Sequence, residues 1–397
     1  MKRLIVILLL FVPMLSSAAR RTAAPPFVRT ELNTLQMPAG ASPTYDLFLR
    51  KIDTLVLTGR TDVRVLHVGG SHVQGGTLTD RLRTRFLSLR YGLDGGRGLV
   101  FPFSAAGTNT PVSYSSSYSG HWESGTCLKP AGLEMGLSGM AVTARDTSAR
   151  VVVDLLPREP RLMQHRYMFN KVDVLGEGSM EPVLLLGPKD TLRGVKGHFD
   201  LPYYTDWVQL AFAGKGDYTL RGMYLDRPNY GFTLCESGVN GASTLSWTRC
   251  ELWEREMHRL MPDLVIFSIG VNDIQGADFD VERFKEQYRE LVKAVRRVNP
   301  YCAILFTGIN DSYRRGVPNP HTEAVQEACR EIARECAGVF WDWYAVMGGS
   351  GSMERWQEAG LAQPDKVHFT PAGYRLVGDL LFEALLESHP GLPLLIL

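Results

Sequence analysis

The chain has 397 residues, of which 45% are hydrophobic and 21% are charged, and its formal net charge is +1 at pH 7. This length is sufficient for one large or two moderate domains with a sizeable core. A nearly neutral chain without a sustained basic stripe argues against nucleic acid or a strongly anionic molecule as the partner.

The first residues predict a signal peptide, residues 1–19. Two basic residues precede a short apolar run, Leu4 to Leu15, and small residues follow it. This order is typical of an export signal that is cleaved near Ala18 or Ala19, and the run is too short for a comfortable transmembrane helix. We therefore expect a protein that is periplasmic or secreted and has no membrane span.

Residues 20–41 contain three prolines and lack hydrophobic periodicity, which predicts a linker. An α/β pattern then begins with a helix that starts at Ser42 and Pro43. A buried strand, Val63 to Val68, follows, and apolar residues at helical spacing come after it. Residues 42–90 are therefore expected to form the first part of an α/β domain.

Residues 91–230 predict an inserted β-sandwich. Short apolar or alternating runs are separated by turn residues, and in one run the apolar side chains recur at every second position. Several short strands at this spacing are typical of two packed sheets. The predicted strands include Val151–Val153, Tyr167–Phe169, Val183–Leu186, Trp207–Phe212 and Tyr218–Leu225.

The α/β pattern resumes in residues 231–397. Strands that alternate with helices predict a parallel sheet with helices on both faces, and hence a three-layer α/β/α domain that the sandwich interrupts. The predicted helices are Trp247–Leu260, Phe284–Val295, Thr322–Cys336 and Tyr374–Leu385, and the predicted strands are Leu264–Ile269, Ala303–Thr307 and Val339–Trp343.

Six cysteines allow up to three disulfides in an oxidising compartment, and their spacing does not select a pairing. The sequence has no CxxC pair and no HExxH motif, so a structural zinc site or a zinc protease is not expected. We predict no metal and no cofactor.

Ser71 is the first candidate for a catalytic residue. It follows Gly69 and Gly70 at the end of a strand and precedes a helix. The glycines permit a sharp turn, and the helix N-terminus presents free N–H groups and a positive dipole. A hydroxyl at such a turn can attack a carbonyl whose oxygen becomes negative. The structural alternative is that Ser71 only caps the helix.

Three further motifs supply partners for this serine. Asp365 and His368 precede the last helix, so His368 would take the proton of Ser71 while Asp365 orients the imidazole. Gly241 lies in an open loop and Asn272 follows a buried strand; with the N–H of Ser71 they would bind the oxyanion. In the structural alternative, Asn272 and Asp273 are turn residues, Gly241 only shapes a loop, and the Asp-x-x-His spacing of Asp365 and His368 occurs by chance.

Taken together, these motifs resemble the SGNH (GDSL-type) hydrolase superfamily over roughly residues 42–90 and 231–390. The matching blocks are Gly69-Gly70-Ser71, Gly241, Gly270–Asp273 and Asp365–His368. The resemblance implies a serine esterase fold in which Ser71, His368 and Asp365 are catalytic and Ser71, Gly241 and Asn272 form the oxyanion hole. In the first block the family has Asp where this chain has Gly70. That Asp is not a triad member, so the resemblance implies altered hydrogen bonds in the loop.

The signal peptide, the Gly-x-Ser-His sequence around Ser71 and the β-insert also resemble bacterial peptidoglycan O-acetylesterases. In that group the insert resembles a carbohydrate-binding module, and the enzymes remove acetyl groups from the 6-hydroxyl of N-acetylmuramic acid. The resemblance implies an O-acetylated glycan, peptidoglycan in particular, as substrate. The aromatic residues that could stack on sugar rings include Tyr114, Tyr118, Trp122 and Trp207.

Two other functions fit the same sequence. An O-acetyltransferase would use the same triad to pass the acetyl group to a sugar hydroxyl. A non-catalytic glycan-binding protein would carry a decayed hydrolase scaffold, which only Gly70 favours. The neighbours His72, Gln74 and Asp273 receive no catalytic role from the sequence, and for His72 a structural role is favoured.

Overall fold

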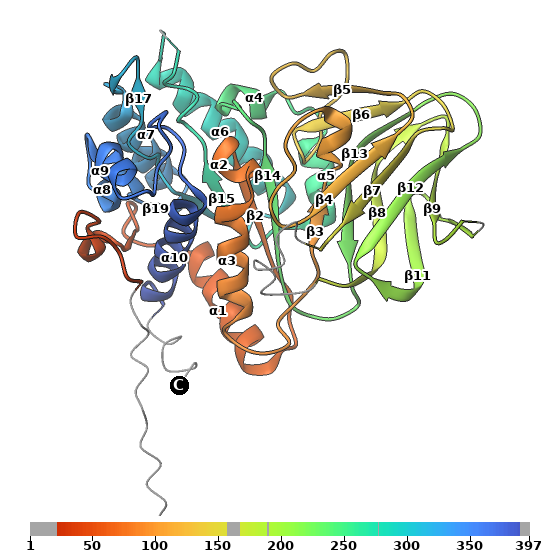
Figure 1. Ribbon diagram of the computed structural model, residues 1–397. Coiled ribbons are helices and arrows are strands. Elements are labelled where there is room, and N and C mark those ends of the chain that lie inside the picture. The colour runs from red at the N-terminus through yellow and green to blue at the C-terminus, as the bar shows by residue number, and fades with distance from the viewer. Residues whose placement is uncertain (1–21, 157–166, 189, 277, 390–397) are drawn as a thin grey trace, which may run out of the picture.

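The computed structural model describes residues 22–156, 167–188, 190–276 and 278–389, and the predicted signal peptide lies outside these ranges. A six-stranded sheet with the order β1-β19-β16-β15-β2-β14 forms the centre of one half of the molecule (Figure 1). All neighbours in it are parallel, except that β1 at one edge is antiparallel to β19. The strands are β1 (Leu35–Gln36), β2 (Val63–Gly69), β14 (Phe232–Gly238), β15 (Leu264–Ser268), β16 (Ala303–Phe306) and β19 (Val339–Trp341).

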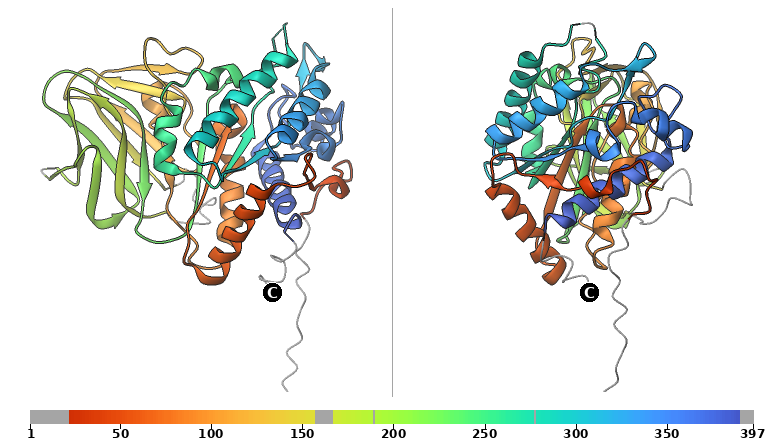
Figure 2. Two further views of the ribbon diagram at one scale, coloured as in Figure 1. Left: turned by 180° about the vertical axis from the view of Figure 1, so that it is seen from behind. Right: turned by 90° about the vertical axis from the view of Figure 1, so that its left-hand side faces the viewer.

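Helices cover both faces of this sheet, and Figure 2 shows the two groups on opposite sides. Successive strand residues face opposite cores: Val65 belongs to one hydrophobic cluster and Leu66 to the other. The predicted three-layer α/β/α fold is therefore confirmed. One face carries α1 (Pro43–Thr58), α3 (Thr77–Leu87), α8 (Trp343–Met347), α9 (Ser352–Glu358) and α10 (Pro371–Glu387), and the other carries α4 (Thr244–Thr248), α5 (Trp253–Leu260), α6 (Val281–Val298) and α7 (Thr322–Glu335).

Between α3 and β14 the chain folds into two antiparallel sheets that pack as the predicted β-sandwich, beside the β14 edge of the parallel sheet (Figure 1). The first sheet has the order β10 (Thr191–Arg193), β9 (Glu181–Leu185), β12 (Trp207–Ala213), β7 (Arg150–Asp154) and β4 (Ser115–Ser119). The second has the order β11 (His198–Thr205), β8 (Phe169–Gly178), β13 (Tyr218–Asp226), β6 (Met140–Ala144) and β5 (Trp122–Thr126), and β3 (Gly98–Val100) also pairs with β13. The sandwich core is continuous with the core beneath α5 and α6.

Short elements complete the described chain. They are the 3-10 helices η1 (Thr30–Leu32) and η2 (Phe103–Ala106), the helix α2 (Ser71–Gln74), and the hairpin of β17 (Tyr313–Arg314) and β18 (Val317–Pro318).

A buried group of charged side chains joins the sandwich to the parallel sheet. The guanidinium of Arg97, which precedes β3, lies 2.5 Å from the carboxylate of Glu236 on β14. Arg83 on α3 lies 3.7 Å from the same carboxylate and donates to the carbonyl of Leu234. Buried charges are costly unless they are paired. These contacts therefore tie α3, β14 and the start of the sandwich to one another.

The structure differs from the sequence prediction in three elements. The segment predicted as a linker, residues 20–41, contributes β1 to the edge of the parallel sheet. The helix predicted from Trp247 to Leu260 is two helices, because the N–H of Leu252 donates to the carbonyl of Met135 instead of continuing a helix. Strand β14 was not predicted, because its buried Glu236 makes the sequence too polar for a core strand.

All six cysteines, which lie within the described ranges, are free thiols, so none of the disulfides that the sequence allows is formed in this structure. Five of the six side chains are buried, Cys336 being the exception. Burial raises the pKa of the Cys235 thiol to about 11. A buried thiol of this kind is a poor nucleophile at neutral pH.

We expect Gly238→Ala to destabilise the protein by ~1–3 kcal/mol, because a Cβ at this position would lie 2.2 Å from the backbone nitrogen of Gln74. Gly276→Ala is the matched control, since a Cβ there meets nothing within 4 Å. That variant is expected to change the free energy of unfolding by less than ~0.5 kcal/mol. Urea denaturation of both variants measures the difference, and equal stabilities would contradict the close packing described.

Candidate active site

Three parallel strands bring the candidate residues to one edge of the sheet. In the register, Gly69 at the end of β2 lies opposite Gly238 of β14 on one side and Ser268 of β15 on the other. Ser71 follows the first of these strands, and Gly241 and Asn272 follow the other two. Because the carboxyl ends of parallel strands meet at one edge, residues far apart in sequence become neighbours there.

Ser71, His368 and Asp365 form one chain of hydrogen bonds. The Oγ of Ser71 lies 2.8 Å from Nε2 of His368, and Nδ1 of His368 lies 2.7 Å from a carboxylate oxygen of Asp365. The other oxygen of Asp365 accepts the backbone N–H groups of Val367 and His368, each at 2.9 Å. The structure therefore brings together the three residues predicted as a catalytic triad.

The carboxyl group of Asp365 remains ionised in this arrangement. Partial burial works to raise its pKa, but the hydrogen bonds from the backbone and ring of His368 and from the backbone of Val367 outweigh burial, so its pKa is lowered. An ionised carboxylate on Nδ1 favours the tautomer whose Nε2 is free to accept a proton from Ser71.

Gly241 and Asn272 lie in two neighbouring loops beside this chain. Gly241 has a φ of +81°, a left-handed conformation that glycine adopts without strain. The side-chain amide of Asn272 donates to the carbonyl of Ala242 at 2.9 Å, which links the two loops. An amide nitrogen carries two hydrogens, so a second N–H of Asn272 is left for another acceptor.

Gly70 lies so close to Asn272 and Ala242 that there is no room for a side chain at this position. A Cβ at Gly70 would lie 2.9 Å from the side-chain nitrogen of Asn272 and 3.4 Å from the carbonyl oxygen of Ala242. Real Cβ atoms essentially never come closer than about 3 Å to such atoms, so a side chain here would displace Asn272. The absence of a side chain at Gly70 therefore permits the observed position of Asn272.

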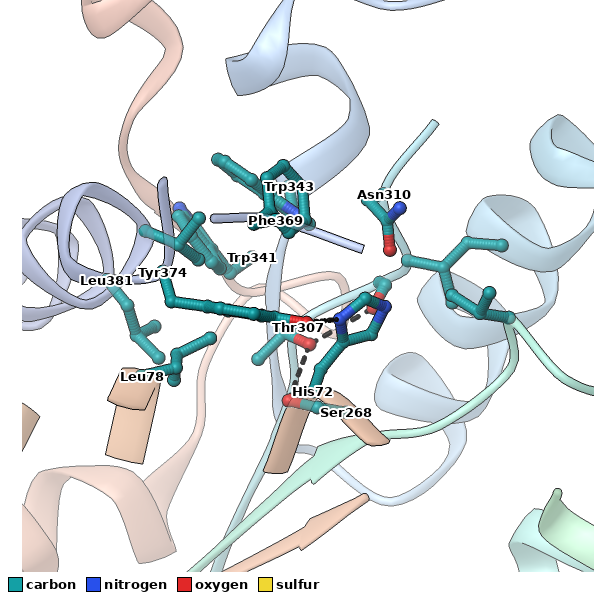
Figure 3. A pocket seen from close by; sticks show the side chains of 14 residues that line it. His72, Leu78, Ser268, Thr307, Asn310, Trp341, Trp343, Phe369, Tyr374 and Leu381 are labelled. Atoms are coloured by element: carbon teal, nitrogen blue, oxygen red, sulfur yellow. Dashed lines mark hydrogen bonds between the residues drawn. The ribbon is translucent and has the colours of Figure 1, made fainter. Parts of the chain in front are cut away.

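The ring of His72, to which the sequence gives no catalytic role, packs against the ring of His368. The two ring centroids lie 5.3 Å apart, and Nδ1 of His72 lies 2.7 Å from the hydroxyl of Tyr374 on α10 (Figure 3). Burial, assisted by the nearby His368, lowers the pKa of His72 to about 3. His72 is therefore a neutral packing residue at neutral pH. The sequence carries no local signal for its partner, because Tyr374 is 302 residues away.

A small cavity of about 40 Å³ lies behind His72 and is lined mainly by apolar side chains, including those of Leu78, Phe369 and Leu381 (Figure 3). Ser71 is not among the residues that line it. A volume of this size holds about one water or one methyl group.

Asp273 points away from the triad and fixes the start of α4. Its carboxylate accepts the backbone N–H of Thr244 at 3.1 Å and the hydroxyl of Thr244 at 2.5 Å. Burial raises the pKa of Asp273 to about 6 against the effect of these hydrogen bonds. In the described ranges no cluster of three His, Cys, Asp or Glu side chains could hold a metal ion.

Residues 203–376 match the model of the GDSL-like lipase/acylhydrolase family. With the α/β/α fold, this match confirms the resemblance to SGNH (GDSL-type) hydrolases. The protein is therefore an esterase in which residues 203–376 resemble the GDSL-like acylhydrolases.

Within this class, the structure is similar to a solved structure of a peptidoglycan O-acetylesterase. The TM-score is 0.71 at 24% sequence identity, and the match covers 89% of this chain and 98% of the other. At this identity the likeness shows a shared fold, which includes the sandwich as well as the α/β part. No curated protein sequence matches the chain.

Two further structures match only part of the chain. A lipase/acylhydrolase from Enterococcus faecalis has a TM-score of 0.32 and 18% identity, over 40% of this chain and 77% of that one. An acetylxylan esterase from Geobacillus stearothermophilus has a TM-score of 0.33 and 19% identity, over 39% of this chain and 73% of that one. Among the described helices, none combines the length and the apolar character that crossing a membrane requires.

The raised pKa of Asp273 predicts a pH-dependent stability that Asp273→Asn removes. The pKa is about 6 in the folded protein and ~3.9 in an unfolded chain, so between these values the folded state binds more protons. The wild type should therefore lose stability relative to Asp273→Asn as the pH rises from 4 to 7, by on the order of 3 kcal/mol. Urea denaturation of both proteins at the two pH values measures this. A difference that does not change with pH would contradict the assignment.

Proposed function

We propose that the chain is an exported serine esterase that hydrolyses acetyl esters on a carbohydrate polymer, with peptidoglycan as the favoured substrate. The observation that carries the proposal is the hydrogen-bonded chain from Ser71 through His368 to Asp365, with the loops of Gly241 and Asn272 beside it. Nucleophile, base, orienting carboxylate and oxyanion donors are the groups that acyl transfer needs.

In this mechanism Oγ of Ser71 attacks the acetyl carbonyl while Nε2 of His368 takes its proton. The imidazolium, held by Asp365, then gives that proton to the departing sugar hydroxyl, which leaves an acetyl-serine. Water attacks the acetyl-serine with His368 again as the base. Acetate is released and Ser71 regains its proton.

The negative charge that develops on the carbonyl oxygen is received by three donors. These are the N–H of Ser71, the N–H of Gly241 and the second N–H of the Asn272 amide. The N–H of Ser71 belongs to the first residue of α2, where helix N–H groups have no partner within the helix. Donors fixed in advance stabilise the charge without reorganising, at ~3–4 kcal/mol for one donor.

The choice of an acetyl ester rests on the surroundings of Ser71. The residues next to it in the sequence are small or polar, among them His72, Gln74 and Gly75. The choice of peptidoglycan rests on the likeness to a peptidoglycan O-acetylesterase over nearly the whole chain, together with the predicted export signal.

We further propose that residues 91–230 act as a glycan-presenting module. Of the four aromatic residues that the sequence suggests, Tyr118 and Trp207 are exposed and are available to stack on sugar rings. Tyr114 is excluded, because it is buried and bonded to the backbone of Phe101. Trp122 packs edge-on against Phe212 and is a packing residue.

Ser71→Ala and His368→Ala should each lower kcat on p-nitrophenyl acetate by several orders of magnitude, and the double variant should be little worse than either. Asn272→Ala should lower kcat by about 10²–10³ with the fold intact. Ser88→Ala and His258→Ala alter an exposed serine and an exposed histidine elsewhere and should leave the rate unchanged. An active Ser71→Ala would refute the nucleophile, and multiplicative losses would argue against a single catalytic unit.

In a series of p-nitrophenyl esters, kcat/KM should be highest for acetate and should fall for butyrate and octanoate. A lipase gains ~0.8 kcal/mol for each CH₂ that it buries and needs an apolar groove beside the serine. Acetate release from O-acetylated peptidoglycan, with and without an added acceptor sugar, tests the natural reaction. A rate that climbs through octanoate would favour a lipid substrate, and acetyl transfer to the acceptor would favour the transferase.

A further inference from the structure

The side chain of Gln74 occupies an unusual position for a residue without a catalytic role. It ends helix α2, three residues after Ser71, and is 1% exposed. Its Oε1 accepts the backbone N–H of Asn240 at 2.6 Å. Its Nε2 donates to the backbone carbonyl of Asn109 at 2.9 Å and to the hydroxyl of Thr108 at 3.0 Å. One buried amide therefore uses both its acceptor and its donor side.

These contacts close a ring of three residues, in which Asn240 takes part through both its backbone N–H and its side chain. The amide of Asn240 donates to Oδ1 of Asn109 at 2.6 Å, and the amide of Gln74 reaches the same oxygen at 3.2 Å. Asn240 directly precedes Gly241, the glycine of the proposed oxyanion hole. The backbone of Asn240 determines where the N–H of Gly241 points. The hydrogen bonds of this ring therefore orient the N–H of Gly241, which is a donor of the proposed oxyanion hole.

The partners of Gln74 come from the chain that leads into the sandwich. Asn109 lies in the loop between η2 and β4, and the N–H of Val112 in that loop donates to the carbonyl of Gly75. On the other side, the side chain of Leu128, after β5, lies 3.1 Å from the Cβ position of Gly241. Figure 1 shows α2 beside β14 and near the start of the sandwich. Residues of the insert thus contact the oxyanion loop from two sides.

We propose that Gln74 is a positioning residue that holds the loop 239–242 at a fixed distance from Ser71 and makes the loop 107–112 part of the active site. The inference rests on the proposed esterase function. Oxyanion donors must lie about 2.7–3.1 Å from the developing charge, so a small displacement of Gly241 weakens the transition state more than the bound substrate. Residue 74 accepts from Asn240 and donates to Asn109, and the amide of glutamine supplies both an acceptor oxygen and a donor nitrogen.

Gln74→Met keeps the volume and removes both kinds of hydrogen bond. On p-nitrophenyl acetate we expect kcat to fall about 10- to 100-fold and KM to change by less than about threefold, because the lost contacts act in the transition state. The rates are expressed per serine titrated with a fluorophosphonate, so that unfolded molecules do not count. Gln74→Glu, which keeps the acceptor and places a second acceptor against Asn109, should also lower kcat.

Gln326→Met is the matched control. Gln326 is another buried glutamine, whose amide donates to the carbonyl of Ile309, and its replacement should lower stability without lowering kcat. Asn109→Ala tests the same ring from an exposed position and needs no change in the core. Combined with Gln74→Met, it should cause little further loss, because residues of one unit are not additive, whereas Gln74→Met with Trp207→Ala should be additive.

The possible results separate the two proposals. A kcat per titrated serine that stays within about twofold of the wild type in Gln74→Met and Asn109→Ala would overturn the role of Gln74 alone. A change confined to KM would also overturn it. If Gln74→Met does not fold, Asn109→Ala decides by the same criteria. A wild type no faster than Ser71→Ala would overturn the esterase proposal and this inference with it.

Discussion

The contact of helix α2 with the ends of β2 and β14 is the constraint on which the site depends. A Cβ at Gly238 would lie 2.2 Å from the backbone of Gln74, so only glycine lets the helix sit directly on the strand. The helix in turn carries Ser71 at its first residue and Gln74 at its last. This packing places Gln74 beside β14, where its side chain accepts the N–H of Asn240 and links α2 to the loop 239–242.

The loop that carries Asp365 and His368 is held to the same edge by backbone interactions. The N–H of Tyr313 donates to the carbonyl of Lys366, and the amide of Asn310 donates to the carbonyl of Val367. With the ring of His72 behind it, His368 is fixed on one side and open to solvent on the other, where its side chain is 39% exposed.

The sandwich and the α/β half of the molecule share one hydrophobic core. This core continues beneath α5 and α6, and the buried pair of Arg97 and Glu236 crosses the junction. Removing one partner of a buried ion pair leaves an uncompensated charge, at a cost of ~3–5 kcal/mol. This buried pair therefore couples the insert, whose loops contact residues 239–242, to the parallel sheet.

The sequence by itself determined the features whose causes are local. The glycine turn at Ser71, the strand before Asn272 and the Asp365–His368 pair, three residues apart, are visible as motifs, and strand–helix alternation predicts the parallel sheet. Only the tertiary structure decided the contacts between distant segments. These contacts include Gly70 with Asn272, His72 with Tyr374, and the hydrogen-bonded ring of Gln74, Asn109 and Asn240. The burial of Glu236, which makes β14 unlike a core strand in sequence, is also visible only in the structure. Periodicity and motif spacing report on neighbours in the chain, whereas such contacts arise when the sheet register brings together segments more than a hundred residues apart.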